Sequence, residues 1–84
     1  MNNKEDLKKQ IIYRSTHRGT KEMDILLGSF VKKYIENLDL KELNDLIELL
    51  FFDDELLYNW YFKNVESNSI PKTKVSMLFK NYKI

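Results

Sequence analysis

The chain of 84 residues is long enough for one small domain, because a chain of this length buries only about 60% of the surface that its unfolded form exposes. Hydrophobic residues make up 43% of the chain and charged residues 32%, a balance typical of folded rather than disordered proteins. No cysteine is present, which excludes a disulfide framework, a thiolate nucleophile and a cysteine-based metal site.

The formal net charge is only +1, but the charges are unevenly distributed along the chain. Residues 1–33 carry +4, residues 34–63 carry −6 and residues 64–84 carry +3. Patches of opposite sign favour association with a complementary protein surface over a uniformly anionic polymer such as DNA. The longest apolar run, Leu49–Phe52, is far too short to span a membrane, and Glu5 and Asp6 argue against a targeting segment. We therefore expect a soluble, cytoplasmic protein.

Apolar residues recur at helical spacing, which predicts helices joined by short turns. The first helix is expected from Lys4 to His17, with an apolar face of Leu7, Ile11 and Ile12 that also includes Arg14. It is expected to stop at Gly19, a residue suited to the left-handed conformation after a helix end.

The second helix is expected over residues 21–37 and carries the clearest apolar stripe of the sequence. Gly28 interrupts this stripe and costs about 1 kcal/mol relative to alanine in a helix interior. We interpret it as the site of a close crossing with another helix. The stripe consists of Met23, Leu26, Leu27, Phe30, Val31, Tyr34, Ile35 and Leu38.

Capping residues mark the three remaining helices. Asp39, with Glu42 three residues later, predicts the start of a third helix that ends near Phe51 or Phe52. Asp53 or Asp54 can cap a fourth, which runs through Leu56, Leu57, Trp60 and Tyr61, and a polar loop follows at residues 66–69. Pro71 is placed in the first turn of a fifth helix containing Val75, Leu78, Phe79 and Tyr82. The predicted fold is all-α, a compact five-helix bundle formed by residues 1–84 as one domain.

The candidate functional site is the first predicted turn, where charged residues of both signs surround one glycine. Helix capping alone is the competing explanation, because cations suit the end of one helix and acidic residues the start of the next. Capping does not require so many charges, however, and an arginine can hold a carboxylate or phosphate with two hydrogen bonds. The candidate partner-binding residues are Arg14, His17, Arg18, Gly19, Thr20, Glu22 and Asp24.

Catalysis by the chain itself is weakly supported, so we predict no catalytic residues, no metal site and no bound cofactor. His17 is the only histidine and has no accompanying nucleophile motif or metal-ligand spacing. Glu22 and Asp24 are two residues apart on a helix and point about 200° apart, so they are unsuited to sharing a proton or metal. The segment Arg18-Gly19-Thr20 lacks the further glycines of a nucleotide-binding loop.

The segment Tyr13–Phe30 closely resembles the succinate dehydrogenase flavinylation factors, also called assembly factor 2. Their RGxxExD pattern is matched by Arg18, Gly19, Glu22 and Asp24, and the later Asp54–Trp60 resembles the second landmark of the family. Many members carry methionine directly after the glycine, where this chain has Thr20.

The resemblance implies a chaperone-like role rather than an enzymatic one. Family members bind the flavoprotein subunit of succinate dehydrogenase, and often of fumarate reductase, and promote covalent attachment of FAD to it. The FAD therefore belongs to the client, and the expected factor is a bacterial cytoplasmic monomer when free. In this hypothesis Arg18 pairs with a client carboxylate or carbonyl, Gly19 permits close approach, and Glu22 and Asp24 contact cations or fix the loop.

Two alternatives stay open at this point. The basic first and last segments could form a helical nucleic-acid-binding module or a general protein-interaction module, for which a steep salt dependence of nucleic-acid binding would be diagnostic. In the other, Glu22 or His17 transfers a proton during flavin attachment instead of only docking to the client.

Overall fold

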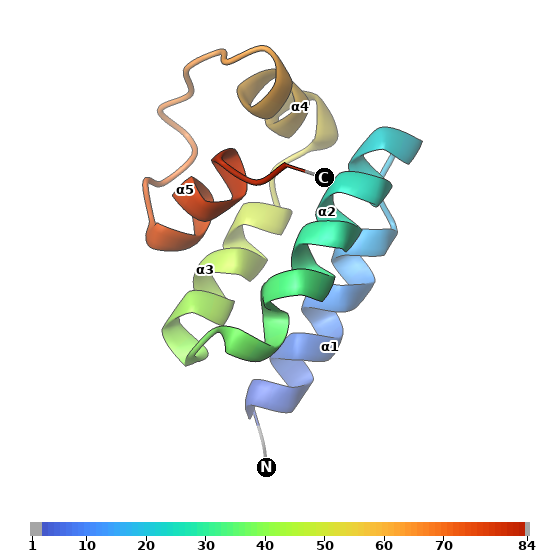
Figure 1. The fold of residues 1–84 in the computed structure, drawn as a ribbon, viewed down its shortest axis with the longest axis vertical. Coiled ribbons are helices and arrows are strands. Elements are labelled where there is room, and N and C mark those ends of the chain that lie inside the picture. Colours follow the sequence, from blue (N-terminus) through green and yellow to red (C-terminus); the bar gives the residue numbers. More distant parts are fainter. Residues whose placement is uncertain (1–2, 84) are drawn as a thin grey trace.

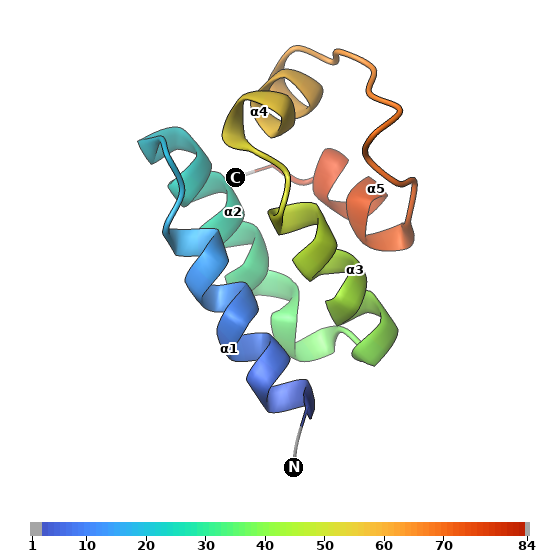
Figure 2. The same cartoon turned by 180° about the vertical axis from the view of Figure 1, so that it is seen from behind.

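A computed structural model describes residues 3–83 of the chain, and within them it contains five α-helices, one 3₁₀ turn and no strand. The all-α prediction is confirmed. Helices α1, α2 and α3 run side by side in alternating directions, and α4 and α5 lie at one end and one side of them (Figures 1 and 2). The elements are α1 (Asn3–Thr16), α2 (Lys21–Tyr34), the 3₁₀ turn Ile35–Asn37, α3 (Leu40–Leu50), α4 (Asp54–Phe62) and α5 (Lys74–Lys80).

Helix α2 is one of the two helices that supply most of the core of the described chain, together with α3, and its apolar stripe is buried as predicted. It lies between α1 and the C-terminal segment, and Phe30 is fully buried at its centre. The Phe30 ring meets those of Phe79 and Tyr82 edge to face, with centroids 5.2 and 5.4 Å apart. The fully buried residues include Ile11, Met23, Leu27, Phe30, Leu43, Leu46, Leu57 and Phe79.

Helix α3 begins where the capping signal predicted. Asp39 accepts a hydrogen bond from the Glu42 backbone N–H at 2.8 Å, and the Glu42 carboxylate accepts one from the Asp39 N–H at 2.9 Å. The start of α4 is also settled, since the Asp53 carboxylate accepts from Leu56 N–H at 2.9 Å and caps the helix. Asp54 is thereby free for a different contact.

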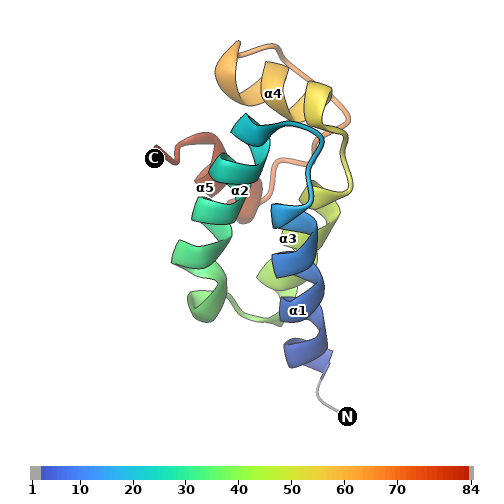
Figure 3. The same ribbon diagram turned by 90° about the vertical axis from the view of Figure 1, so that its right-hand side faces the viewer.

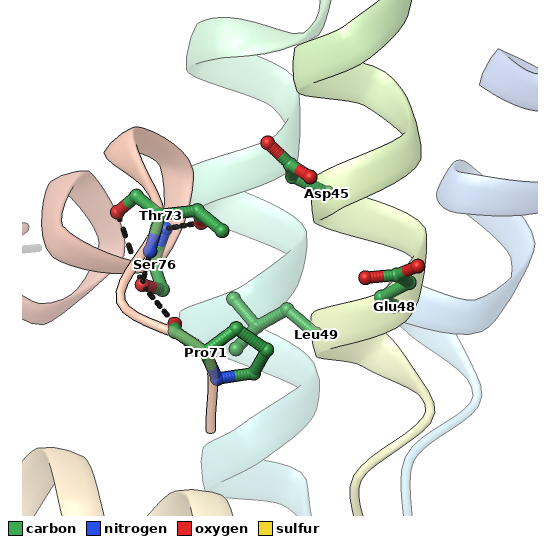
Figure 4. Close-up of a pocket in the computed structure, with 6 residues that line it drawn as sticks. All are labelled: Asp45, Glu48, Leu49, Pro71, Thr73 and Ser76. Atoms are coloured by element: carbon green, nitrogen blue, oxygen red, sulfur yellow. Dashed lines mark hydrogen bonds between the residues drawn. The ribbon is translucent and has the colours of Figure 1, made fainter. Parts of the chain in front are cut away.

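Helix α5 begins later than predicted. Pro71 lies before the helix instead of in its first turn, because Thr73 and Ser76 form a reciprocal capping box that fixes the start at Lys74. The Ser76 hydroxyl also donates to the Pro71 carbonyl at 2.7 Å (Figure 4). Pro71 instead lines a small pocket together with Leu49 of α3 (Figure 4).

Two details of the predicted packing are wrong. The side chain of Ile12 is 49% exposed, because the buried face of α1 follows Leu7, Ile11 and Ser15. A Cβ placed on Gly28 would lie 3.6 Å from the Thr16 methyl group, an ordinary van der Waals distance, so no close helix crossing requires glycine there. Gly28 is therefore a helix-weakening residue without a packing explanation inside the described chain.

In residues 3–83, none of the helices combines the length and apolar character needed to cross a membrane.

Replacing Gly28 with alanine should raise the free energy of unfolding by about 1 kcal/mol, the difference between the two residues in a helix interior. The alanine methyl group fits beside Thr16 without displacing it. Urea denaturation followed by circular dichroism measures the change. Destabilisation would contradict the geometry, because it would reveal a contact closer than 3.6 Å.

The stability of the fold should fall in alkaline solution through Tyr61. Burial raises the pKa of the Tyr61 hydroxyl above its ordinary value of 10.0, and the neighbouring Tyr82 hydroxyl adds to this shift. The unfolded chain therefore loses this proton first, so the stabilisation is complete below pH 10 and declines as the pH rises through the pKa of the folded state. Denaturation midpoints measured between pH 9 and 11 should fall less steeply in Tyr61→Phe, and equal slopes would refute this origin.

Candidate functional site

The predicted site is built around the short connection between α1 and α2, which lies at the same end of the bundle as α4 (Figure 3). The structure brings the seven candidate residues together over the last turn of α1, this connection and the first turn of α2. It also adds residues from the connection between α3 and α4 that the motif did not include. An open groove of about 300 Å³ is lined by Arg14, His17, Arg18, Gly19, Leu50, Phe51, Phe52, Asp53 and Asp54.

Arg18 is the residue that joins these two connections. Its side chain is only 8% exposed, and its Nε donates to Asp54 Oδ1 at 2.7 Å. The other guanidinium nitrogens donate to the carbonyl oxygens of Leu50 at 2.7 Å and Phe52 at 2.8 Å. Those carbonyls lie at and just beyond the end of α3, where a helix leaves backbone acceptors without internal partners. The guanidinium fork is thus occupied within the chain.

Asp54 and Asp24 complete this network. Asp54 Oδ2 accepts a hydrogen bond from the Gly19 backbone N–H, so one carboxylate holds both Arg18 and its neighbour. Asp24 Oδ1 accepts from the Arg18 backbone N–H at 2.6 Å, which ties the connection to the first turn of α2. The connection is therefore held from two sides by carboxylates.

Gly19 is required for a different reason from the one predicted. Asn64 is the residue with a positive φ among those described, and Gly19 is not in the left-handed conformation. A Cβ on Gly19 would instead lie 2.8 Å from Asp54 Oδ2, closer than real contacts allow. The glycine lets the backbone approach the Asp54 carboxylate.

Thr20 also has a structural task. It is the N-cap of α2, with extended backbone angles, and its hydroxyl accepts from Met23 N–H at 3.3 Å. A threonine at this position thus starts the second helix, a role that a methionine side chain could not fill.

Three candidate residues have exposed side chains that take no part in holding the connection: Arg14, His17 and Glu22. Arg14 lies over the ring of Phe51 with its guanidinium carbon 4.4 Å from the ring centre, and Phe51 is itself 62% exposed. The His17 ring stacks on Tyr13 at 3.9 Å and its Nδ1 lies 2.7 Å from the Tyr13 carbonyl oxygen, so Nδ1 carries the hydrogen there and Nε2 points elsewhere. Glu22 is exposed and makes no hydrogen bond or ion pair with any described residue.

The candidate residues therefore form two groups, one that holds the connection in place and one whose side chains are exposed. Arg18, Gly19, Thr20 and Asp24 shape the connection, whereas Arg14, His17 and Glu22 are displayed by it. Sequence reasoning missed the pairing of Arg18 with Asp54 and the exposed ring of Phe51. The second landmark, which begins at Asp54, was the available signal for the first of these. We call the exposed surface formed by residues 17–22 with Arg14 and Phe51 the motif surface.

In residues 3–83, no three histidine, aspartate or glutamate side chains are grouped so that they could hold a metal ion. The carboxylate of Asp24 is engaged by Arg18 and the imidazole by Tyr13, so neither Asp24 nor Glu22 orients His17 by a hydrogen bond. Fold and site together define a small all-helical protein that presents a charged surface loop held by hydrogen bonds.

Comparison with known proteins identifies the family. The family described as flavinator of succinate dehydrogenase matches residues 9–83, so the chain belongs to it and the resemblance inferred from the motif is confirmed. The succinate dehydrogenase assembly factor 2 of Dictyostelium discoideum, a mitochondrial protein, is 36% identical over 78 residues, 93% of this chain and 55% of that protein. The FAD assembly factor SdhE of Acetobacter pasteurianus is 30% identical over 73 residues, 87% of this chain and 64% of that one.

The relatives are longer than the region they share with this chain. The mitochondrial assembly factor 2 of Lodderomyces elongisporus is 37% identical over 63 residues, 75% of this chain but only 38% of that protein. The chain thus spans between about two fifths and two thirds of the length of these relatives. No solved structure is significantly similar to it.

Breaking the Arg18–Asp54 pair should strongly destabilise the fold. Arg18→Gln leaves a half-buried carboxylate and two carbonyl groups without their donor, which should lower the free energy of unfolding by about 3 kcal/mol. Asp54→Asn should cost less, and the double variant should cost less than the sum of the two by about 1 to 2 kcal/mol. Urea denaturation of the four proteins measures this coupling.

Arg14→Gln is the matched control, because the side chain of this arginine is exposed and its guanidinium lies over the face of Phe51. It should change stability by about 0.5 kcal/mol. If the effects of Arg18→Gln and Asp54→Asn were simply additive, the pair would not hold the two connections together.

Proposed function

We propose that the chain is an assembly factor that binds the flavoprotein subunit of succinate dehydrogenase and promotes covalent attachment of FAD to that subunit. Family membership supports this assignment, since its relatives are named for succinate dehydrogenase assembly and for FAD assembly. The corresponding subunit of fumarate reductase is a second client of the same kind. In this proposal the FAD belongs to the client, and the chain binds no cofactor of its own and acts as a monomer in the cytoplasm of a bacterium.

The observation that carries the proposal is the hydrogen-bonded network that supports the motif surface. Arg18, Asp24 and Asp54 fix the connection by hydrogen bonds of 2.6 and 2.7 Å, so little freedom is left to lose when a partner binds. A surface ordered in advance can hold a client in a geometry where the flavin and the attacking histidine react. Holding reactants in such a geometry can lower a barrier by several kcal/mol without a catalytic group from the holder.

The proposed contacts differ from those expected at first for Arg18. Its guanidinium already binds Asp54 and two carbonyl groups, so we assign it to positioning the loop instead of pairing with a client carboxylate. Glu22, Arg14 and His17 are the exposed groups that would meet the client, and the backbone at Gly19 would lie close to it. Thr20 and Asp24 contribute by fixing the start of α2.

The nucleic-acid alternative has no supporting observation. Helices α1 and α5, which carry parts of the two basic segments, both contact α3, and α3 lies between them with its acidic residues (Figures 1 and 2). Acidic α3 therefore separates the positive charges of α1 from those of α5, which is unfavourable for binding one phosphate backbone along both helices.

Replacing Glu22 with glutamine tests the motif surface most directly. Glu22 is exposed and unpaired among the described residues, so its loss should lower the thermal midpoint only slightly, through the weaker interaction with the dipole of α2. We expect binding to the purified flavoprotein subunit to weaken about tenfold, as for a charged group that pairs across an interface. Flavin fluorescence of the co-expressed subunit on a denaturing gel, together with calorimetric titration, measures both effects.

Glu66→Gln is the matched control, an exposed glutamate in the connection before α5. Normal binding with lost flavin attachment in Glu22→Gln would support proton transfer by Glu22 in place of docking. Normal binding and normal attachment would show that the motif surface does not meet the client through this residue.

A further inference from the structure

A second feature of the surface is a groove between α1 and α2, separate from the motif surface. It has a volume of about 380 Å³ and its exposed lining is mainly apolar. Ile12, which sequence reasoning placed in the core, forms part of it with its side chain half exposed. The groove is lined by Ile12, Ser15, Thr16, Gly28, Val31, Lys32, Ile35 and Glu36. We call it the α1–α2 groove.

The absence of a side chain at Gly28 leaves space in this groove. Within the described chain nothing requires a glycine at this position, since a Cβ would meet Thr16 only at 3.6 Å. The residue nevertheless weakens α2 by about 1 kcal/mol relative to alanine. A longer side chain would project into the groove beside Ile12. The glycine therefore destabilises α2 but leaves an open apolar recess on its surface. Such a recess is typical of a site that receives a side chain from another molecule.

The lining of the α1–α2 groove contains one acidic residue, which is paired, and one lysine, which forms no ion pair with a described residue. The acidic member, Glu36, is paired with Lys8 at 2.9 Å, and this ion pair raises the pKa of the Lys8 ammonium. Lys32 forms no ion pair with a described residue. Lys9, one turn before Ile12 on α1, is also exposed. An apolar recess with unpaired lysines beside it is complementary to an apolar side chain flanked by acidic residues.

The groove also continues toward the motif surface. Thr16, at the end of α1, lines the groove, and its hydroxyl lies 3.2 Å from Nδ1 of His17. The groove and the motif surface therefore adjoin at the end of α1, and one partner could contact both. Two adjoining contacts hold a partner in one orientation more firmly than a single loop does.

We propose that the α1–α2 groove is a second docking site for the client flavoprotein, and that it receives an apolar side chain from a client helix bearing acidic residues on either side. This proposal rests on the proposed function. The apolar anchor fills the recess over Gly28, and the acidic neighbours pair with Lys32 and Lys9. The motif surface then meets the client next to this anchor.

Filling the groove from within tests the proposal. Gly28→Ala and Gly28→Leu should strengthen α2 to a similar extent, because alanine and leucine have similar helix propensities. Binding should instead follow side-chain size, with Gly28→Leu weakening the affinity for the purified flavoprotein subunit about tenfold and Gly28→Ala having a smaller effect. Asn44→Leu, which adds a leucine to the exposed side of α3, is the control for a new apolar surface and should bind normally.

The charge requirement has its own pair of variants. Lys32→Glu should weaken binding and reduce its dependence on salt between 50 and 300 mM, whereas Lys41→Glu on α3 should do neither. Calorimetric titration with the flavoprotein subunit measures affinity, and denaturation confirms that each variant folds.

Outcomes separate this proposal from the function on which it rests. Wild-type affinity in Gly28→Leu, with weakened binding in Glu22→Gln, would overturn the groove and leave the proposed function intact. Failure of the wild-type chain to bind the subunit would overturn the function itself. A dimer of the free chain that Gly28→Leu converts to a monomer, seen by sedimentation, would show that the groove receives a second copy and would also overturn the proposal.

Discussion

The structure depends on one guanidinium group placed where three segments of the chain meet. Arg18 leaves the end of α1, binds Asp54 at the start of α4 and satisfies two carbonyl oxygens at the end of α3. A planar fork with several donors can bind a carboxylate and two separate carbonyls at once, which a lysine ammonium cannot do with the same geometry. A small bundle without disulfides thereby fixes two connections that would otherwise be among its most mobile parts.

This arrangement changes the meaning of the charged motif. A cluster of charges on a surface loop is usually interpreted as a set of groups waiting for a partner. In this chain part of the cluster already forms hydrogen bonds within the protein, because Asp24 and Asp54 bind Arg18 and Gly19. These internal hydrogen bonds favour binding by the remaining exposed groups, since an ordered loop loses less conformational entropy when a partner binds. A motif can thus be important to a partner through residues that never touch it.

The fold could be predicted largely from the sequence, because each helix carries its own signal in apolar spacing and capping residues. Asp39 with Glu42 marked α3 correctly, and the stripe through Phe30 marked the core. The errors arose where two local signals competed. Pro71 suggested a helix start, but the Thr73–Ser76 capping box determines it, and Ile12 and Ile11 are adjacent so only one can face the core. The Arg18–Asp54 pair joins residues 36 apart, and no periodicity within one helix can predict such a contact.

Gly19 differs from most glycines of tight turns, because a neighbouring side chain and not its own backbone angle requires it. The requirement is therefore epistatic: it exists only while position 54 carries an aspartate whose carboxylate lies against the backbone. In a related sequence with a shorter residue at position 54, a side chain at position 19 would meet no such obstacle. The tolerance of position 19 to a side chain therefore depends on which residue occupies position 54.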